Sequence, residues 1–134
     1  MKGLIAAYHR RLWGSGDLTA IDEAFAADAV VHLTGFDGSA VQTVRDDASR
    51  YFGAFTAVST SVSSLLADGD RVVLQWSTTG THVGPYGKVA ATGRVVTMHG
   101  IDIFRVDDRR IVELWSMWDG LDVYDQLGVL PELW

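Results

Sequence analysis

The sequence contains no cysteine, and only two of its 134 residues are proline. Without cysteine the chain can form no disulfide bond, no thiolate metal site and no thiol nucleophile. Its four histidines are scattered and lack the short spacings of a metal-ligand set. We therefore expect no metal and no cofactor, and the chemistry should depend on Asp, Glu, His, Tyr or Ser side chains.

Positive charge is also scarce, since the chain has eleven Lys and Arg but seventeen Asp and Glu, which gives a net charge of −6. No basic cluster is interleaved with aromatic residues, which argues against nucleic acid and against an anionic membrane surface as partners. The charge balance favours a neutral or weakly charged ligand, and we expect an apolar or aromatic small molecule.

Long apolar runs are missing as well. No stretch reaches the ~20 apolar residues of a membrane span, and the apolar run at the N-terminus is too short for a signal peptide. The sequence therefore predicts a cytoplasmic protein. With 48% hydrophobic and 21% charged residues, it is typical of one globular domain over residues 1–134, folding alone or as a homodimer or higher homo-oligomer.

The N-terminal part of the chain has apolar residues at helical spacing. Residues 2–13 have this spacing, and the glycines at 14 and 16 are typical of a helix C-terminus. Asp17 is predicted to cap a second helix over residues 18–25, which leads into a β-branched segment of strand character at 28–33. The helical pattern returns at residues 41–57.

Strand patterns then follow at residues 58–66, 71–82, 94–106 and 111–118. They are separated by Asp68-Gly69-Asp70, by a Gly-rich segment at 84–93 and by residues 107–110. Such connections predict an antiparallel meander. The tail, residues 121–134, is expected to contain a short closing helix.

Helices first and a long sheet afterwards predict an α+β fold, in which a curved antiparallel sheet wraps around the N-terminal helices. A sheet that curls around helices can leave an internal pocket between them. The alternative is that side chains fill this space completely.

Two stretches of the chain resemble a known superfamily. The first runs from Tyr8 to His32, and the second comprises residues 81–84, 91–94, 99–115 and 126–131. Together they are similar to the nuclear transport factor 2-like superfamily, and within it to the SnoaL-like polyketide cyclases and the steroid Δ-isomerases. The resemblance implies a cone with an internal pocket. It leaves the reaction open, because the superfamily holds isomerases, cyclases, dehydratases, epoxide hydrolases and non-catalytic binders.

Asp102 is the first candidate for a catalytic residue. It lies mid-strand between two isoleucines and shares a strand face with Phe104, which is unusual for a surface carboxylate. Burial in a pocket would raise its pKa and let it act as a general acid or hydrogen-bond donor near neutral pH. The resemblance implies that steroid isomerases keep a protonated Asp at the matching position. The alternative is an ordinary pairing with Arg94, Arg105 or a backbone amide.

His32 is the second candidate. It lies near the end of the first strand, where the resemblance places a polar pocket residue, and an ordinary imidazole pKa of ~6.5 suits a base. A structural role is the alternative. The resemblance also implies that the carboxylate base of steroid isomerases falls on Leu33 here, so their route of proton transfer is missing.

Ser116 stands where, by the resemblance, SnoaL-like aldol cyclases use an aspartate as general acid and base. A serine hydroxyl cannot replace that carboxylate, although it could bind a carbonyl group. The alternative is that a small residue here simply makes room for a ligand.

The face on which Ser116 lies depends on the register of the last hairpin. Residues 107–110 lack the Asn-Gly of a two-residue turn, so a loop of three or five residues is expected, and it places Leu114, Ser116 and Trp118 on the Asp102 face. An even loop would instead bring Glu113 opposite Phe104.

Asp119 is a third candidate, as an acid at the pocket rim, although it is more often a helix cap at such a position. Tyr8 and His9 are adjacent on the first helix, so only one should point into a cavity; steroid isomerases place a Tyr donor at the slot of His9. A larger set of residues is expected to form a flat apolar surface that binds the ligand: Tyr51, Phe52, Trp76, Phe104, Leu114 and Trp118. The alternative is that these side chains simply belong to the hydrophobic core.

These features favour a cofactor-independent acid/base enzyme of polyketide or related secondary metabolism, which cyclises, isomerises or dehydrates a carbonyl-bearing cyclic substrate. Asp102 would protonate or hydrogen-bond an enolic oxygen, and His32 would move the proton. Epoxide opening with Asp102 or Asp119 as the acid is a variant. The rival hypotheses are a non-catalytic binding or accessory protein that lost its base, and a structural dimer.

Overall fold

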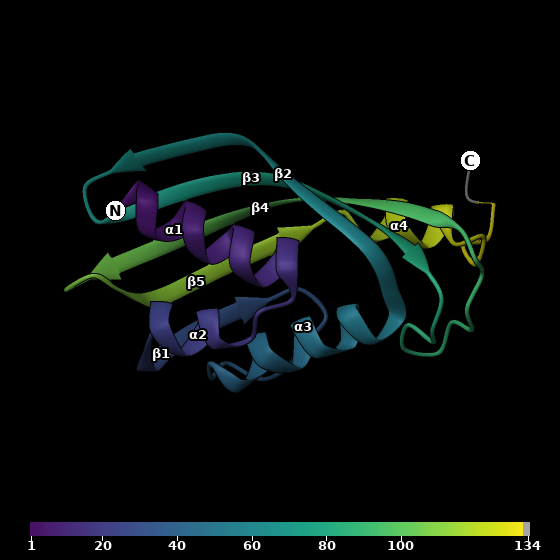
Figure 1. Ribbon diagram of the computed structural model, residues 1–134, viewed down its shortest axis with the longest axis horizontal. Helices are drawn as coiled ribbons and strands as arrows, with labels where there is room; N and C mark the ends of the chain where they lie inside the picture. The colour runs from purple at the N-terminus through teal and green to yellow at the C-terminus, as the bar shows by residue number, and fades with distance from the viewer. Residues whose placement is uncertain (133–134) are drawn as a thin grey trace.

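The protein has an α+β fold in which helices lie against one face of a five-stranded sheet (Figure 1). The computed structural model describes residues 1–132, so Leu133 and Trp134 of the predicted closing segment lie outside the described residues. The helices are α1 (Lys2–His9), α2 (Thr19–Ala24), α3 (Gln42–Ala54) and α4 (Gly120–Gln126), and a π-helical turn, η1 (Arg10–Gly14), continues α1. The strands are β1 (Phe25–Leu33), β2 (Phe55–Asp68), β3 (Arg71–His82), β4 (Val95–Asp107) and β5 (Arg110–Trp118).

The sheet is mixed, with the strand order β1-β5-β4-β3-β2. Strands β2 to β5 form the predicted antiparallel meander, but β1 pairs in parallel with β5, and Val31 lies opposite Leu114. The predicted antiparallel arrangement is therefore confirmed for β2 to β5, and the parallel β1–β5 pair makes the sheet mixed at this edge. A parallel pair needs a long connection, and here α3 and three strands separate the two partners along the chain.

Two predicted helices extend into segments that are strands. The predicted helix 41–57 ends at Ala54, and Phe25, predicted in the second helix, is the first residue of β1. Near the start of β2, Ala57 has a φ of 53° and the pairing with β3 shifts register between Thr56 and Ser59. This bulge bends β2, the edge strand next to β3, shortly after it leaves α3 (Figure 1).

The core lies between α1 and the concave face of the sheet. Ile5, Tyr8 and Leu12 recur at helical spacing and are buried, and the ring of Tyr8 packs edge-to-face on the fully buried Phe104 of β4 and on Phe25. On the strands, alternate residues such as those at 72, 74, 102, 104 and 106 point to the same buried side. This alternation determines which residues of β3, β4 and β5 can reach an internal space.

The β4–β5 hairpin has the predicted register but not the predicted loop. Asp107 pairs with Arg110 around a two-residue turn, Asp108-Arg109, in which both residues have positive φ, 48° and 60°. A register shift follows between Arg105 and Val106, where β5 contributes one extra residue. Because this bulge offsets the even turn, Asp102 lies opposite Ser116 and Phe104 opposite Leu114.

The double substitution Asp108→Asn and Arg109→Gly is expected to stabilise the protein by about 1 kcal/mol. Both positions have the left-handed backbone of a primed turn, which Asn and Gly adopt with less strain than Asp and Arg. Urea unfolding at equilibrium measures the change. A loss of stability would contradict the two-residue turn.

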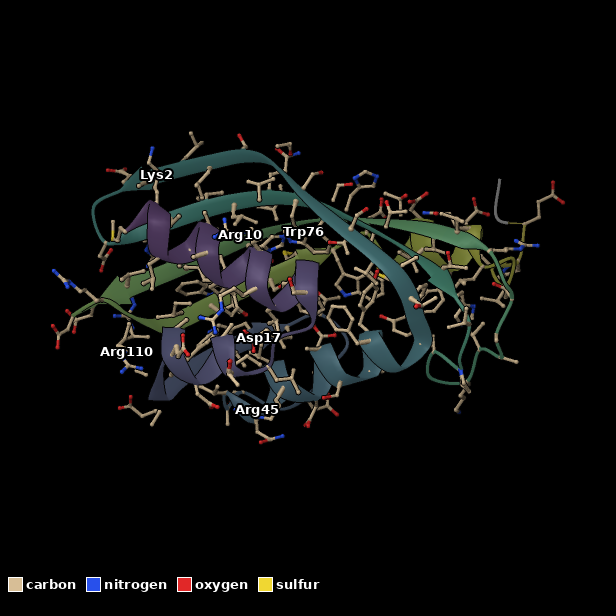
Figure 2. All side chains as sticks on the ribbon, in the orientation of Figure 1. Lys2, Arg10, Asp17, Arg45, Trp76 and Arg110 are labelled. Atoms are coloured by element: carbon tan, nitrogen blue, oxygen red, sulfur yellow. The ribbon has the colours of Figure 1, made fainter. Side chains whose placement is uncertain are left out.

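Charged side chains stabilise both ends of α2 (Figure 2). Asp17 accepts a hydrogen bond from the backbone N–H of Thr19, the first residue of α2, at 3.0 Å and forms an ion pair with Arg11. The N-cap residue itself is Leu18, one position after the predicted cap. At the other end of α2, Arg110 donates to the carbonyl oxygens of Asp22 and Glu23. These contacts hold α2 and the start of β1 against β5.

None of the helices within residues 1–132 has the length and apolar character needed to span a membrane.

A candidate active site around Asp102

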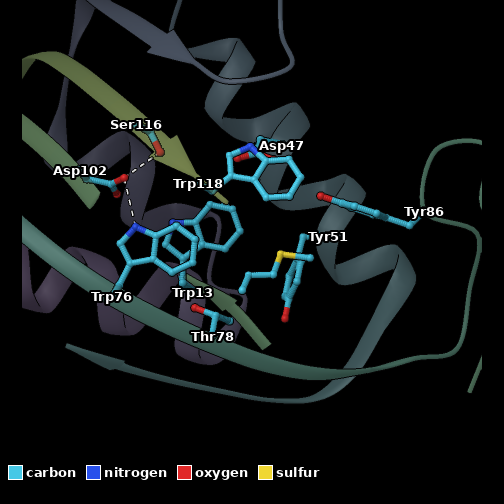
Figure 3. Close-up of a pocket in the computed structure, with 10 residues that line it drawn as sticks. Trp13, Asp47, Tyr51, Trp76, Thr78, Tyr86, Asp102, Ser116 and Trp118 are labelled. Carbon is cyan, nitrogen blue, oxygen red and sulfur yellow. Dashed lines mark hydrogen bonds between the residues drawn. The ribbon is translucent and has the colours of Figure 1, made fainter. Parts of the chain in front are cut away.

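A pocket opens between α3, η1 and the concave face of the sheet (Figure 3). Its atom-free volume is about 500 Å³, including the part that opens to solvent. Seven of the lining residues come from the sheet or its β3–β4 connection, namely Trp76, Thr78, Tyr86, Met98, Asp102, Ser116 and Trp118, and the others are Trp13, Asp47 and Tyr51. Five of the ten lining residues are therefore aromatic, and two carry carboxyl groups.

Asp102 points into this pocket because it belongs to the inward set of β4. Its carboxyl oxygen Oδ1 accepts hydrogen bonds from the Ser116 hydroxyl at 2.7 Å and from the Trp76 indole N–H at 3.2 Å. The residue is only 5% exposed, and both donors come from neighbouring strands, β5 and β3. The alternative of a pairing with Arg94 or Arg105 is not what the structure shows.

Burial raises the pKa of Asp102 from its ordinary value to about 7. The hydrogen bonds from Ser116 and Trp76 favour the carboxylate and oppose this rise, whereas the negative charge of Asp47 adds to it. Near neutral pH a large fraction of Asp102 therefore carries its proton. A protonated carboxyl group in an aromatic pocket can donate a hydrogen bond or a proton to a ligand oxygen.

Gly100 lets Trp76 reach Asp102. The two residues lie opposite each other in the β3–β4 pair, and a Cβ at Gly100 would come within 2.2 Å of Cζ2 of Trp76 and 2.7 Å of the Met117 carbonyl oxygen. With glycine at this position, the indole ring occupies the space next to residue 100 and its N–H reaches the carboxyl group two residues further along β4. The glycine therefore shapes the pocket wall.

Asp47 is the second carboxyl group of the pocket, and the sequence reasoning did not select it. It extends from α3, one turn before Tyr51, and burial raises its pKa to about 6 while the charge of Arg50 opposes the rise. At pH 7 it is therefore mostly ionised. The pocket combines one carboxyl that is partly protonated with one that is mostly a carboxylate.

The predicted site residues fall into two groups. Tyr51, Trp76, Ser116 and Trp118 line the pocket together with Asp102. The other seven do not line it: Tyr8, Phe104 and Leu114 are buried in the core, Phe52 stacks on the ring of Trp13, and His9, His32 and Asp119 make the contacts described below.

His9 is buried but lies outside the pocket. Its Nε2 is 2.9 Å from the Thr60 hydroxyl, and burial lowers its pKa to about 4, so the imidazole is neutral at physiological pH. Neither member of the pair Tyr8 and His9 is a lining residue, which corrects the expectation that one of them would be.

The structure places His32 on the other side of the sheet. Its ring stacks on Trp115, and its Nε2 is 2.8 Å from a carboxyl oxygen of Glu113, on a surface open to solvent. The side chains of β1 alternate, and Val31 is the buried neighbour. His32 therefore cannot exchange a proton with a ligand beside Asp102.

Asp119 is a helix cap. Its Oδ1 accepts a hydrogen bond from the backbone N–H of Asp122 in the first turn of α4. The residue borders a groove on the outer face of the sheet, and it is not among the residues that line the internal pocket.

Five lining residues were missed by the sequence reasoning: Trp13, Asp47, Thr78, Tyr86 and Met98. Strand alternation could have found Thr78, two residues beyond Trp76, and Met98, four before Asp102. Helical spacing could have found Asp47, four residues before Tyr51. Tyr86 has no such signal, because it lies in the β3–β4 connection.

A helix-covered, curved sheet with a pocket on its concave face defines the nuclear transport factor 2-like class of protein, and solved structures of this class match the chain. TsrD from Streptomyces laurentii matches with a TM-score of 0.85 at 23% identity, over 96% of this chain and 95% of that chain. IdmH from Streptomyces antibioticus, a candidate polyketide cyclase, matches with a TM-score of 0.82 at 29% identity, over 96% and 99%. AclR from Streptomyces galilaeus, a candidate hydroxylase, matches with a TM-score of 0.85 at 26% identity, over 98% and 83%.

The family model for SnoaL-like polyketide cyclases matches residues 4–127. The chain therefore belongs to the SnoaL-like polyketide cyclase family, as the resemblance of its sequence indicates. The search among curated proteins gave no match.

Proposed function

We propose that the protein is a cofactor-independent acid/base enzyme of polyketide or related secondary metabolism, which acts on a cyclic substrate with a ketone group. The observation that carries this proposal is Asp102, a buried carboxyl group with a raised pKa at the wall of an aromatic pocket. Membership of the cyclase family and the likeness to IdmH support the same kind of enzyme.

In the proposed reaction, the ketone oxygen of the substrate lies beside the protonated Asp102. As a proton leaves the neighbouring carbon, negative charge develops on this oxygen, and the hydrogen bond from Asp102 strengthens with it. Trp76 and Ser116 keep the Asp102 carboxyl group in place, because both donate hydrogen bonds to its Oδ1. The pocket therefore stabilises the enol form of the substrate.

The walls fit a flat and mostly apolar ring system. The rings of Trp13, Trp76 and Trp118 come from three different elements, and in Figure 3 they lie on one side of Asp102, with Trp76 nearest to it. Planar rings pack well on indole faces, and only a few polar groups are needed to orient such a ligand. A fused-ring ketone meets both requirements.

Substitution Asp102→Asn is expected to lower catalysis of enolisation by about 100-fold, because Asn supplies no transferable proton. The reaction is followed as exchange of the α-hydrogens of 2-tetralone in deuterated water, by proton NMR. Binding of 2-naphthol, whose hydroxyl mimics the enol, is followed through tryptophan fluorescence. The matched control is Asp107→Asn, an exposed carboxylate at the end of the same strand, and it should retain both activities.

A second candidate function is ligand binding without catalysis. It is favoured by Leu33 and Ser116, which stand where the resemblance implies catalytic carboxylates in related enzymes. A wild-type protein that binds 2-naphthol but leaves the exchange of 2-tetralone at its rate in buffer would support this candidate and contradict the enzyme.

We also propose that a second copy of the chain covers the outer face of the sheet. An apolar groove there is lined by Ile101, Ile103, Trp115 and Met117, and Met117 is 71% exposed. An exposed patch of this kind is typical of a protein interface. Light scattering in solution tests this proposal, and a monomer at micromolar concentration would contradict it.

A further inference from the structure

We propose that Asp47 is the general base of this pocket and moves the substrate proton that Asp102 cannot take. The inference rests on the proposed enolisation and names the residue that performs its other half. A site with one acid and no base would stabilise an enol without forming it. His32, the base expected from the sequence, lies on the opposite face of the sheet.

The position of Asp47 suits this role. Val44, Ala48 and Tyr51 form the buried stripe of α3, and Asp47 lies within this stripe by helical spacing. Its carboxyl group therefore faces the pocket and not the solvent, in the same lining as Asp102. In Figure 3 it lies beside the ring of Trp118, while Asp102 lies beside Ser116 and Trp76. The two carboxyl groups thus approach a bound ring from different walls.

The carboxylate of Asp47 also has no bonding partner among residues 1–132 that would hold its negative charge. Within residues 1–132, no hydrogen bond or ion pair to its oxygens is present, whereas Asp102 accepts two hydrogen bonds. Its helical neighbour Asp46 points to solvent and accepts a hydrogen bond from the side chain of Gln42 at 2.9 Å. A partly buried carboxylate without a donor is a stronger base than a hydrogen-bonded one.

The charges around Asp47 allow it to work at neutral pH. On its own helix Arg50 favours the ionised form, and this guanidinium is held between the rings of Phe36 and Tyr86 at 4.7 and 4.9 Å from their centroids. From the facing strand β4, Asp102 shares the pocket, and the Asp47 charge raises the pKa of Asp102 and of Tyr8. The base is thus ionised at a pH at which the acid still holds its proton.

The proposed step is balanced without any further reactant. The Asp47 carboxylate takes a proton from the carbon beside the ketone, and the electrons of that C–H bond form the carbon–carbon double bond of the enol. The ketone oxygen gains a hydrogen bond or the proton from Asp102. Return of the proton from Asp47 to a carbon of the same molecule, and of the other proton to Asp102, completes an isomerisation and restores both carboxyl groups.

Substitution Asp47→Asn tests this role with 2-tetralone and 2-naphthol as probes. The exchange of 2-tetralone that the protein catalyses should fall by about 100-fold or more, because Asn accepts no proton at this pH. Binding of 2-naphthol should remain within about threefold of the wild-type value, because its hydroxyl is held by Asp102. The matched control is Asp46→Asn, which removes the same charge one residue away on the exposed face and should change neither measurement more than about twofold.

The pH dependence gives a second readout that loss of packing would not produce. Exchange by the wild-type protein should rise as Asp47 ionises, fall as Asp102 loses its proton, and so pass through a maximum between about pH 6 and 7. In Asp47→Asn the rising limb should disappear.

The outcomes separate this inference from the proposed function. If Asp47→Asn exchanges 2-tetralone at the wild-type rate and Asp102→Asn does not, Asp47 is not the base and the acid role of Asp102 stands. If the wild-type protein catalyses no exchange, the enzyme proposal and the base fail together.

Discussion

At pH 8 the Asp102→Asn protein is expected to be more stable than the wild type by about 2–4 kcal/mol. The carboxyl group has a pKa of about 7 in the folded protein, compared with its ordinary value near 3.8 in the unfolded chain. A shift of this size corresponds to about 4 kcal/mol between the two protonation states, and the Asn side chain has no charge to bury.

The sign of the effect follows from proton binding. Below about pH 4 the Asp102 carboxyl group is protonated in both the folded and the unfolded protein, and its contribution to stability is fully present. As the pH rises from 4 to 7 only the folded state holds it, so the stability of the wild type falls. Asp47, with a pKa of about 6, adds a smaller decline in the same direction, and it remains in the variant.

Urea unfolding at pH 5 and pH 8 measures this effect. The difference in stability between Asp102→Asn and the wild type should be about two to three times larger at pH 8 than at pH 5. The Asn side chain keeps an oxygen acceptor for Trp76 and Ser116, so the comparison isolates the charge. A difference that is equal at both pH values would mean that Asp102 titrates as an ordinary surface carboxylate.

Substitution Gly100→Ala is expected to destabilise the protein by about 3 kcal/mol and to open the Asp102 hydrogen bond. The added methyl group would lie 2.2 Å from the Trp76 ring and 2.7 Å from the Met117 carbonyl oxygen, and neither distance is tolerated. The ring must rotate away from the strand, and its N–H then leaves the carboxyl group. The fluorescence of the protein should change together with its stability.

A double-mutant cycle with Trp76→Ala separates the two clashes. In the Trp76→Ala background the clash with the indole ring is removed and the contact with the Met117 backbone remains, so Gly100→Ala should cost about 1 kcal/mol less than in the wild type. Equal costs in both backgrounds would show that the indole ring does not lie over Gly100.

The inward face of the sheet could be predicted from sequence because strand alternation is strict. Asp102, Trp76 and Ser116 were selected as pocket residues, and all three line the pocket. The register that joins Asp102 to Ser116 was also predicted, although the expected odd loop is wrong. The real turn is even, and the bulge in β5 that compensates it leaves no sign in the sequence.

The errors in the predicted site have physical causes. In β1 the buried residues Ala29 and Val31 alternate with His32, which therefore lies on the outer face, whereas the resemblance to related enzymes implies a pocket residue at this position. Asp47 was missed because only the apolar residues of α3 were used to define its buried stripe. Tyr86 reaches the pocket through the path of a long connection, which depends on tertiary packing and not on local pattern.

The central claim is that Asp102 presents a proton to the oxygen of a ring held in the aromatic pocket. A crystal structure of the complex with 2-naphthol tests it most directly. The naphthol oxygen is expected within hydrogen-bonding distance, about 2.7 Å, of an Asp102 carboxyl oxygen, with the rings between Trp13, Trp76 and Trp118. A naphthol that is bound only in the outer groove, beside Trp115 and Met117, would contradict it.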